Sequence, residues 1–202
     1  NRIKLIIIAC NTASSVGLHT LYNQTKIPII DVISPVVKTA CKTTKTKCVG
    51  IIGTETTIQS KEYQKQIKKI NKNIKTIYKA CPLFVPIIEE GLFDHKIAEH
   101  AAKRYLKTFK DTAVDTLILG CTHYPIMKNI IRKHLPKTIH IIDSPLLTAN
   151  QVSKFLKQNN LNNPNTSNPN DQFYITDKVS RFNEIANMFL KKQIKNIKYI
   201  QL

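Results

Sequence analysis

Short, unbroken apolar runs alternate along this chain with longer amphipathic segments. The runs at 5–9 and 117–120 are continuously apolar, which predicts strands buried on both faces. Further strands are expected at 27–32, 49–53, 75–80, 139–142 and 197–200, with 173–176 as a final central strand. Strands that alternate with helices of this length predict an α/β fold with mostly parallel sheets flanked by helices.

The amphipathic segments supply the helices. The clearest lies at 96–109, where Ile97, Ala101, Tyr105 and Phe109 recur four residues apart. The segment 82–86 is expected to be extended, and the Asn/Pro-rich stretch 159–171 to be a long loop. The other helices are predicted at 12–24, 36–42, 54–70, 126–134, 146–158 and 179–191.

One strand–loop–helix unit occurs twice, about 111 residues apart. Its first copy ends in Cys10 and its second in Cys121, each cysteine directly following the apolar run. A second strand, an acid and a proline then follow in both copies, with Asp31 and Asp143 as the acids. Matching order and spacing indicate an internal duplication, and therefore two similar α/β lobes that face one another with a site between them.

The two cysteines are the strongest candidates for chemistry. The carboxyl ends of strands are where open α/β sheets bind ligands. A thiol at a helix N-terminus is also expected to ionise more readily. A single cysteine at a strand end is usually a small buried apolar residue, but two in repeated settings favour a function. Each cysteine is followed by residues whose hydrogen-bond donors are suited to a carboxylate ligand, namely Asn11 and Thr12 after Cys10, and Thr122 and His123 after Cys121.

Several other polar residues are weaker candidates. His123 is either an acid/base partner of Cys121 or an orienting group. Thr54 and Thr57 follow a strand and either contact an anionic ligand or only cap a helix; the Gly-rich pattern and lysine of a phosphate loop are absent. Glu89 is a candidate catalytic helper. Cysteine and histidine spacing typical of structural zinc is missing, so we expect two-thiol chemistry without metal or cofactor.

Composition and charge narrow the class of protein. The net charge of +18 comes mostly from lysines spread over every segment, without interleaved aromatic residues, so a solvated surface is expected rather than a nucleic-acid site. No apolar run approaches the roughly 20 residues that span a bilayer, and no signal-peptide pattern opens the sequence. We therefore expect a cytoplasmic protein, and the five cysteines indicate free thiols.

Ala-Cys-Asn-Thr-Ala at 9–13 and Leu-Gly-Cys-Thr-His-Tyr-Pro at 119–125 resemble the two signatures of the bacterial glutamate racemases, in the aspartate/glutamate racemase superfamily. Gly53-Thr54-x-x-Thr57, the segment 82–89 and Phe173-Tyr174 are similar too, so the resemblance covers nearly the whole chain. It implies interconversion of L- and D-glutamate for peptidoglycan synthesis, without pyridoxal phosphate or metal. It also implies glutamate as the small-molecule partner, no membrane partner, and allows a homodimer.

The resemblance further implies roles and boundaries. Cys10 would serve the D-enantiomer and Cys121 the L-enantiomer. One lobe would comprise 1–34 with 144–202, and the other 35–143. The residues that would hold the amino acid are Asn11, Thr12, Thr54, Thr57, Thr122 and His123.

The sequence departs from the family at its start. Asp-Ser-Gly and Pro-Tyr-Gly motifs precede the first cysteine in the family. Both motifs are absent here, and by comparison with a typical domain length roughly 60 residues are absent with them. Since the first residue is Asn1, we expect that the chain begins partway through a longer protein. The 202-residue chain alone is therefore expected to have an open sheet edge and weak or no activity. The alternatives are an aspartate or other amino-acid racemase of the superfamily, an inactive truncated remnant, or a basic binding protein that keeps the fold.

Overall fold

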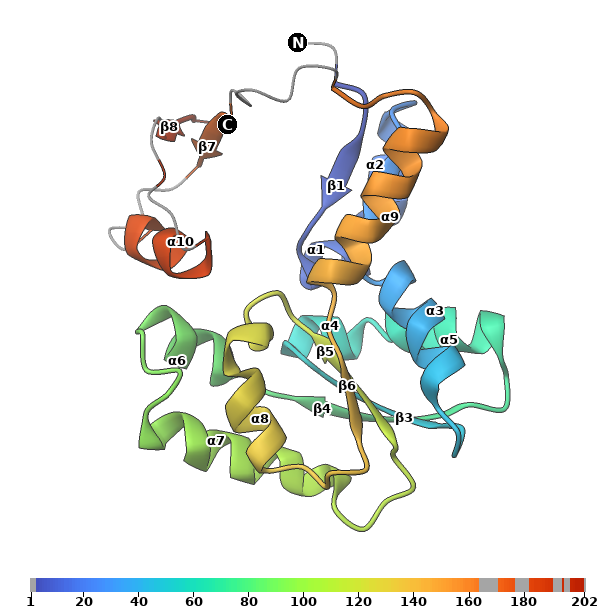
Figure 1. Cartoon of the computed structure of the whole chain (residues 1–202), viewed down its shortest axis with the longest axis vertical. Helices are drawn as coiled ribbons and strands as arrows, with labels where there is room; N and C mark the ends of the chain where they lie inside the picture. The colour runs from blue at the N-terminus through green and yellow to red at the C-terminus, as the bar shows by residue number, and fades with distance from the viewer. Residues whose placement is uncertain (1–2, 164–170, 177–181, 191–193, 195–196, 202) are drawn as a thin grey trace. The chain divides into compact units, whose positions relative to one another are not determined.

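The chain divides into two compact units, residues 1–161 and 162–202. The computed structural model describes residues 3–163, 171–176, 182–190, 194 and 197–201 (Figure 1).

The larger unit contains a four-stranded parallel sheet in the order β4-β3-β5-β6. All six residues of β3 and all five of β5 are buried, as expected for inner strands covered on both faces. Figure 1 shows helices α7 and α8 on one side of this sheet and α3 and α5 on the other. The mostly parallel, helix-flanked architecture predicted from the sequence is thus confirmed. The bounds are α3 Ser34–Thr43, β3 Cys48–Gly53, α5 Glu62–Ile70, β4 Lys75–Ala80, α7 Lys96–Leu106, β5 Thr116–Gly120, α8 Lys128–Lys133 and β6 His140–Ile142.

A second, two-stranded parallel sheet precedes it in sequence. Strand β1 (Ile6–Ile8) pairs with β2 (Ile29–Asp31), and the helices α1 (Asn11–Val16), α2 (Leu18–Gln24) and α9 (Pro145–Gln158) accompany them. The prediction that the first strand is buried on both faces was wrong. Ile8 is buried but Ile7 is 45% exposed, because alternate side chains point to opposite faces of a strand and the described residues cover only one face here.

Two predicted helices are each divided in two. The segment 12–24 breaks at Gly17, between α1 and α2. The segment 54–70 forms α4 (Glu55–Gln59) and α5, because Lys61 between them adopts a left-handed conformation with φ of 56°. A left-handed residue cannot continue a right-handed helix.

The expectation of an extended segment at 82–86 was also wrong. Helix α6 (Phe84–Glu89) begins there and includes Pro86 as its third residue. Proline is tolerated at this position because the first turn of a helix has no internal partner for its backbone N–H groups. Two 3₁₀ turns complete this unit, η1 (Lys107–Phe109) and η2 (Tyr124–Met127).

Two glycines allow the central strands to pack closely. A Cβ atom on Gly50 would lie 2.8 Å from the Phe109 ring, and one on Gly120 would lie 2.7 Å from the backbone oxygen of Ile52. Gly120 is the last residue of β5 and directly precedes Cys121. The position of Cys121 therefore depends on a strand pair too close to accept a side chain at this point.

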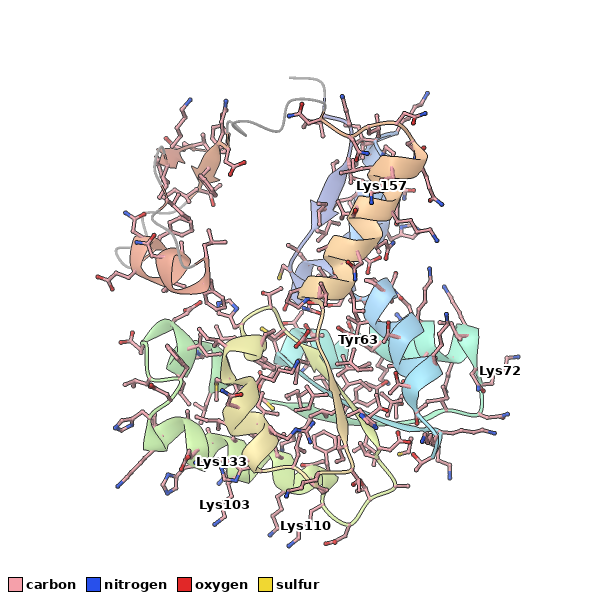
Figure 2. The ribbon with its side chains drawn as sticks, in the orientation of Figure 1. Tyr63, Lys72, Lys103, Lys110, Lys133 and Lys157 are labelled. Atoms are coloured by element: carbon pink, nitrogen blue, oxygen red, sulfur yellow. The ribbon has the colours of Figure 1, made fainter. Side chains whose placement is uncertain are left out.

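The lysines labelled in Figure 2 point away from the interior of the larger unit. Lysines are spread along the whole sequence, but the fold gathers four of the chain's lysines around one cavity of about 510 Å³, formed with His134 and neighbouring apolar residues. One of the four, Lys133, forms an ion pair with Glu99. The four lysines are Lys103, Lys107, Lys110 and Lys133.

The smaller unit contains β7 (Phe173–Ile175), α10 (Phe182–Leu190) and β8 (Ile197–Tyr199), with β7 and β8 parallel. The expected helix at 179–191 agrees with α10 where it is described, whereas 179–181 and 191 lie outside the described residues. Residues 164–170 of the expected loop at 159–171 also lie outside them. The prediction of a central strand at 173–176 was wrong, because β7 has β8 as its only strand neighbour within the described residues. The lobe boundaries predicted above stay a prediction.

Candidate functional site

Three strands of the larger unit end in segments that carry the candidate residues. Cys10 follows β1 and caps α1, Thr54 follows β3 and caps α4, and Cys121 follows β5. The carboxyl ends of β3 and β5 lie side by side, because Gly53 pairs with Gly120. This is the edge at which parallel sheets bind ligands.

One small cavity, of about 150 Å³, unites these segments. It is smaller than the roughly 300–1,000 Å³ of pockets for drug-sized ligands, so it suits a small molecule. Seven of the residues predicted from the sequence line it, together with Val85 of α6. The seven are Cys10, Asn11, Thr12, Thr54, Cys121, Thr122 and His123.

Three threonine hydroxyls form a closed triangle at this site. Thr12 Oγ1 lies 2.9 Å from Thr54 Oγ1 and 3.1 Å from Thr57 Oγ1. Thr54 in turn donates to Thr57 at 2.9 Å. Thr54 also accepts from the backbone N–H of Thr57, so both interpretations of its role, helix cap and site residue, apply. The triangle joins α1 to α4.

Glu89, His123 and Cys121 form a chain of polar contacts. His123 Nε2 lies 3.2 Å from Glu89 Oε1, and His123 Nδ1 lies 3.9 Å from Cys121 Sγ, within reach for sulfur. An ionised carboxylate only accepts, so Glu89 places a proton on Nε2 of the neutral ring. Nδ1 then presents its lone pair to the thiol, which is the arrangement a general base needs.

The expected easy ionisation of Cys121 was wrong. Burial raises the pKa of this thiol to about 11; the backbone N–H groups of His123 and Tyr124 oppose the shift, and negative charge on Cys10 and Glu89 adds to it. Cys121 is only 6% exposed. A four-residue 3₁₀ turn follows it rather than a long helix, so the favourable dipole at its N-terminus is too short to outweigh desolvation.

The setting of Cys10 differs. Its side chain is exposed and its sulfur accepts from the backbone N–H of Ala13 at 3.5 Å. All five cysteines are free thiols. The two cysteines of the repeated unit therefore line the same cavity from unlike environments, one open to solvent and one enclosed.

Asn11 connects the site to a residue that sequence reasoning missed. The hydroxyl of Tyr63 on α5 donates to Asn11 Oδ1 at 2.6 Å, and both side chains are buried. The helical spacing of Tyr63 and Ile67 could have placed this tyrosine on an inner face, and a buried tyrosine hydroxyl requires a partner. Nothing local identifies that partner, which lies 52 residues away in sequence. Val85 was missed because 82–86 was expected to be extended.

Within the described residues, no group of three or more His, Cys, Asp or Glu side chains is arranged to hold a metal ion. None of the helices in the described part of the chain combines the length and apolar character required to cross a bilayer.

Comparison with known proteins gives consistent matches. Residues 1–152 match the profile of a family described as Asp/Glu/Hydantoin racemase. The chain is 38% identical over 200 residues to the glutamate racemase of Geobacter metallireducens, covering 99% of this chain and 74% of that protein. Its fold resembles the crystal structure of glutamate racemase isoform RacE1 from Bacillus anthracis, with a TM-score of 0.92, 36% identity and coverage of 99% and 74%. It also resembles the crystal structure of the glutamate racemase of Francisella tularensis, solved in complex with D-glutamate. That match has a TM-score of 0.92 and 39% identity, and it covers 98% of this chain and 74% of the other.

Proposed function

This chain belongs to the Asp/Glu/hydantoin racemase family, and we propose that it interconverts L- and D-glutamate by two-thiol acid–base chemistry. The observation that carries the proposal is that Cys10 and Cys121, from two different strand ends, line one small cavity. Racemisation requires a base on one face of the α-carbon and an acid on the other. Two thiols across a shared cavity are suited to that task.

The proposed reaction conserves protons and charge. One cysteine enters the cycle as a thiolate and the other as a thiol. The thiolate takes the α-proton, and the electron pair of the broken C–H bond stays on the substrate. The opposite thiol then delivers its proton to the other face of the α-carbon and becomes the thiolate. We propose Cys121 as the base for L-glutamate and Cys10 as the base for D-glutamate. Each reaction then leaves the two cysteines in the protonation states that the reverse reaction requires.

The Glu89–His123 pair supports Cys121 in this scheme. Because burial raises the pKa of the Cys121 thiol to about 11, the free thiol is a poor source of thiolate near neutral pH. His123 Nδ1, 3.9 Å from the sulfur, is placed to take its proton. Glu89 holds the imidazole from the other side at 3.2 Å. His123 thus acts as base for the thiol, and Glu89 as a positioning residue.

The remaining polar residues are proposed to hold the amino acid. The hydroxyls of Thr12, Thr54 and Thr57 and the Asn11 amide offer donors to its carboxylates, and Thr122 also lines the cavity. The D-glutamate produced would supply peptidoglycan synthesis, as the family resemblance implies. Five free thiols fit a reducing compartment, and we propose the cytoplasm. A homodimer stays an expectation of the resemblance.

A racemisation assay tests this proposal. The 202-residue chain, and the longest natural polypeptide that contains it, are incubated with L- or D-glutamate in D₂O, and circular dichroism and proton NMR follow racemisation and deuteration at the α-carbon. We expect deuterated product from both enantiomers in the longest polypeptide, and loss of racemisation in Cys10→Ala and in Cys121→Ala. Faster racemisation of aspartate than of glutamate would replace the proposed substrate. Full activity in either alanine variant would refute the two-thiol mechanism.

A further inference from the structure

Tyr63 lies beneath both cysteine-bearing turns and contacts each of them. Its hydroxyl bonds to Asn11, the residue after Cys10. Its ring packs against Gly120, the residue before Cys121, so closely that a Cβ atom on Gly120 would lie 3.2 Å from Tyr63 Cε2. Figure 2 labels Tyr63 in the interior of the larger unit. The side chain is 1% exposed and therefore held on every side.

The direction of the Tyr63–Asn11 hydrogen bond follows from the chemistry of the two groups. Burial, with negative charge at Asp31 and Cys121 adding to it, raises the pKa of Tyr63 far above its ordinary value, so the hydroxyl keeps its proton. That proton needs an acceptor, and the carbonyl oxygen Oδ1 of Asn11 lies 2.6 Å away. In the opposite orientation the amide would turn its N–H groups toward the hydroxyl, and the described residues offer the O–H proton of Tyr63 no other acceptor.

With Oδ1 bound to Tyr63, the amide nitrogen of Asn11 is left over. Nδ2 is buried and has no hydrogen-bond partner within the part of the chain that the structure describes. Asn11 is 1% exposed and lines the small cavity beside Cys10. A buried N–H donor without an acceptor is costly, and such groups in folded proteins are usually satisfied by protein, water or ligand. The unpartnered donor therefore points to a ligand with an acceptor atom.

We propose that Tyr63 is a positioning residue that locks the Asn11 amide so that Nδ2 donates to a carboxylate of the bound amino acid. The inference rests on the proposed function, and it names the group recognised. An amino acid substrate carries lone-pair acceptors on its carboxylates, whereas its ammonium group can only donate. Tyr63 itself touches neither substrate nor reacting atoms and acts through Asn11.

A double-mutant cycle tests the inference in the longest natural polypeptide that contains these residues. Tyr63→Phe keeps the ring against Gly120 and removes only the hydroxyl. We expect KM for both enantiomers to rise about tenfold with a smaller change in kcat, because an amide free to rotate no longer offers its donor at a fixed place. In the Asn11→Ala background the same substitution should change KM by less than twofold.

A matched control separates this effect from general loosening of the core. Tyr105 is also buried, and its hydroxyl accepts from the backbone N–H of Leu83. Tyr105→Phe should lower the melting temperature by an amount comparable to Tyr63→Phe and leave KM within twofold of wild type. Equal rises in KM for the two single variants would mean a merely structural role and overturn the inference.

Two further outcomes separate the inference from the proposed function. Suppose that the wild-type protein racemises glutamate. The role of Tyr63 alone is then overturned if Tyr63→Phe leaves KM unchanged. It is also overturned if Tyr63→Phe raises KM by the same factor in the wild-type and Asn11→Ala backgrounds. If turnover is too slow to measure, calorimetric titration with D-glutamate supplies dissociation constants for the same cycle. A wild-type protein that neither turns over nor binds glutamate would refute the proposed function and the inference together.

Discussion

Because Cys121 is buried as a thiol, we expect the rate of the proposed racemisation to depend strongly on His123. Because the pKa of this thiol is about 11, only about one thiol in 1,000 is ionised at pH 8, a deficit of about 4 kcal/mol at 1.36 kcal/mol per pH unit. In the proposed mechanism, His123, whose Nδ1 lies 3.9 Å from the Cys121 sulfur, takes the proton of the thiol. The substitution His123→Asn keeps a polar side chain of moderate size and removes the base. We expect kcat/KM to fall about 10²- to 10³-fold, within the range of general-base catalysis.

The pH dependence provides the first check. Below the pKa of the thiol, each pH unit raises the thiolate fraction about tenfold. In His123→Asn, kcat/KM should therefore rise steeply from pH 7 toward pH 10, because only hydroxide-driven ionisation of Cys121 remains. The wild-type profile should be much flatter over the same range. His100→Asn, on the exposed surface of α7, is the matched control and should leave both profiles unchanged.

Isotope effects identify which face of the substrate is affected. The two enantiomers are equally stable in water, so kcat/KM must fall by the same factor in both directions. The proton-transfer step at Cys121 becomes the slowest one in His123→Asn. L-glutamate deuterated at the α-carbon should then show a full primary isotope effect, because Cys121 removes that deuteron in the proposed mechanism. The isotope effect on D-glutamate should approach unity, because Cys10 removes that deuteron in a step that is no longer limiting.

Two results would refute this account. Equal isotope effects on both enantiomers would mean that His123 does not act on one face. The reverse pattern would mean that Cys121 serves the D-enantiomer. The assay requires only initial rates with protiated and deuterated substrates, followed by circular dichroism, and neither result depends on the absolute activity of the preparation.

Three other predictions follow from the same structure. Burial opposes the ionisation of Asp115, but hydrogen bonds from Thr44 and from the backbone at 45–46 lower its pKa to about 2. The ionised carboxylate therefore stabilises the folded state fully above the ordinary pKa of an aspartate, and this stabilisation is lost as the pH falls toward 2. Asp115→Asn should thus lower the free energy of unfolding by about 1–2 kcal/mol at pH 7, after allowance for solvent screening, and by much less near pH 2.5 in urea denaturation. Gly120→Ala should lower it by about 1–3 kcal/mol, since the new Cβ would lie 2.7 Å from the Ile52 carbonyl oxygen, and a melting temperature equal to wild type would contradict this. Iodoacetamide should alkylate Cys121 slowly, with a rate that rises about tenfold per pH unit below pH 11, measured by mass spectrometry of the labelled peptide; a rate independent of pH would contradict the raised pKa.

Local pattern predicted the parts of this fold in which the local signal and the tertiary environment agree. The strand β3 and residues 117–120 of β5 are apolar, and both strands are buried throughout. The repeat of strand and cysteine pointed to Cys10 and Cys121, and both line one cavity. In these places a run of a few residues is sufficient to specify the structure.

The rest depended on contacts that no local pattern contains. A left-handed Lys61 divides a segment that reads as one helix. The ionisation of Cys121 was misjudged because the extent of its burial is set by elements from across the chain. The bond between Tyr63 and Asn11 joins residues 52 positions apart. Helix breaks, desolvation and long-range hydrogen bonds all require the three-dimensional structure.

The triangle of Thr12, Thr54 and Thr57 bears on the thermodynamics of ligand entry. In the absence of a ligand the three hydroxyls already satisfy one another. A carboxylate that accepts hydrogen bonds from these hydroxyls replaces existing hydrogen bonds with new ones. The total number of hydrogen bonds therefore does not rise. For the proposed substrate complex we therefore expect these groups to release little heat on association, and selectivity among ligands to depend on the charge and spacing of the ligand oxygens rather than on a gain in the number of hydrogen bonds.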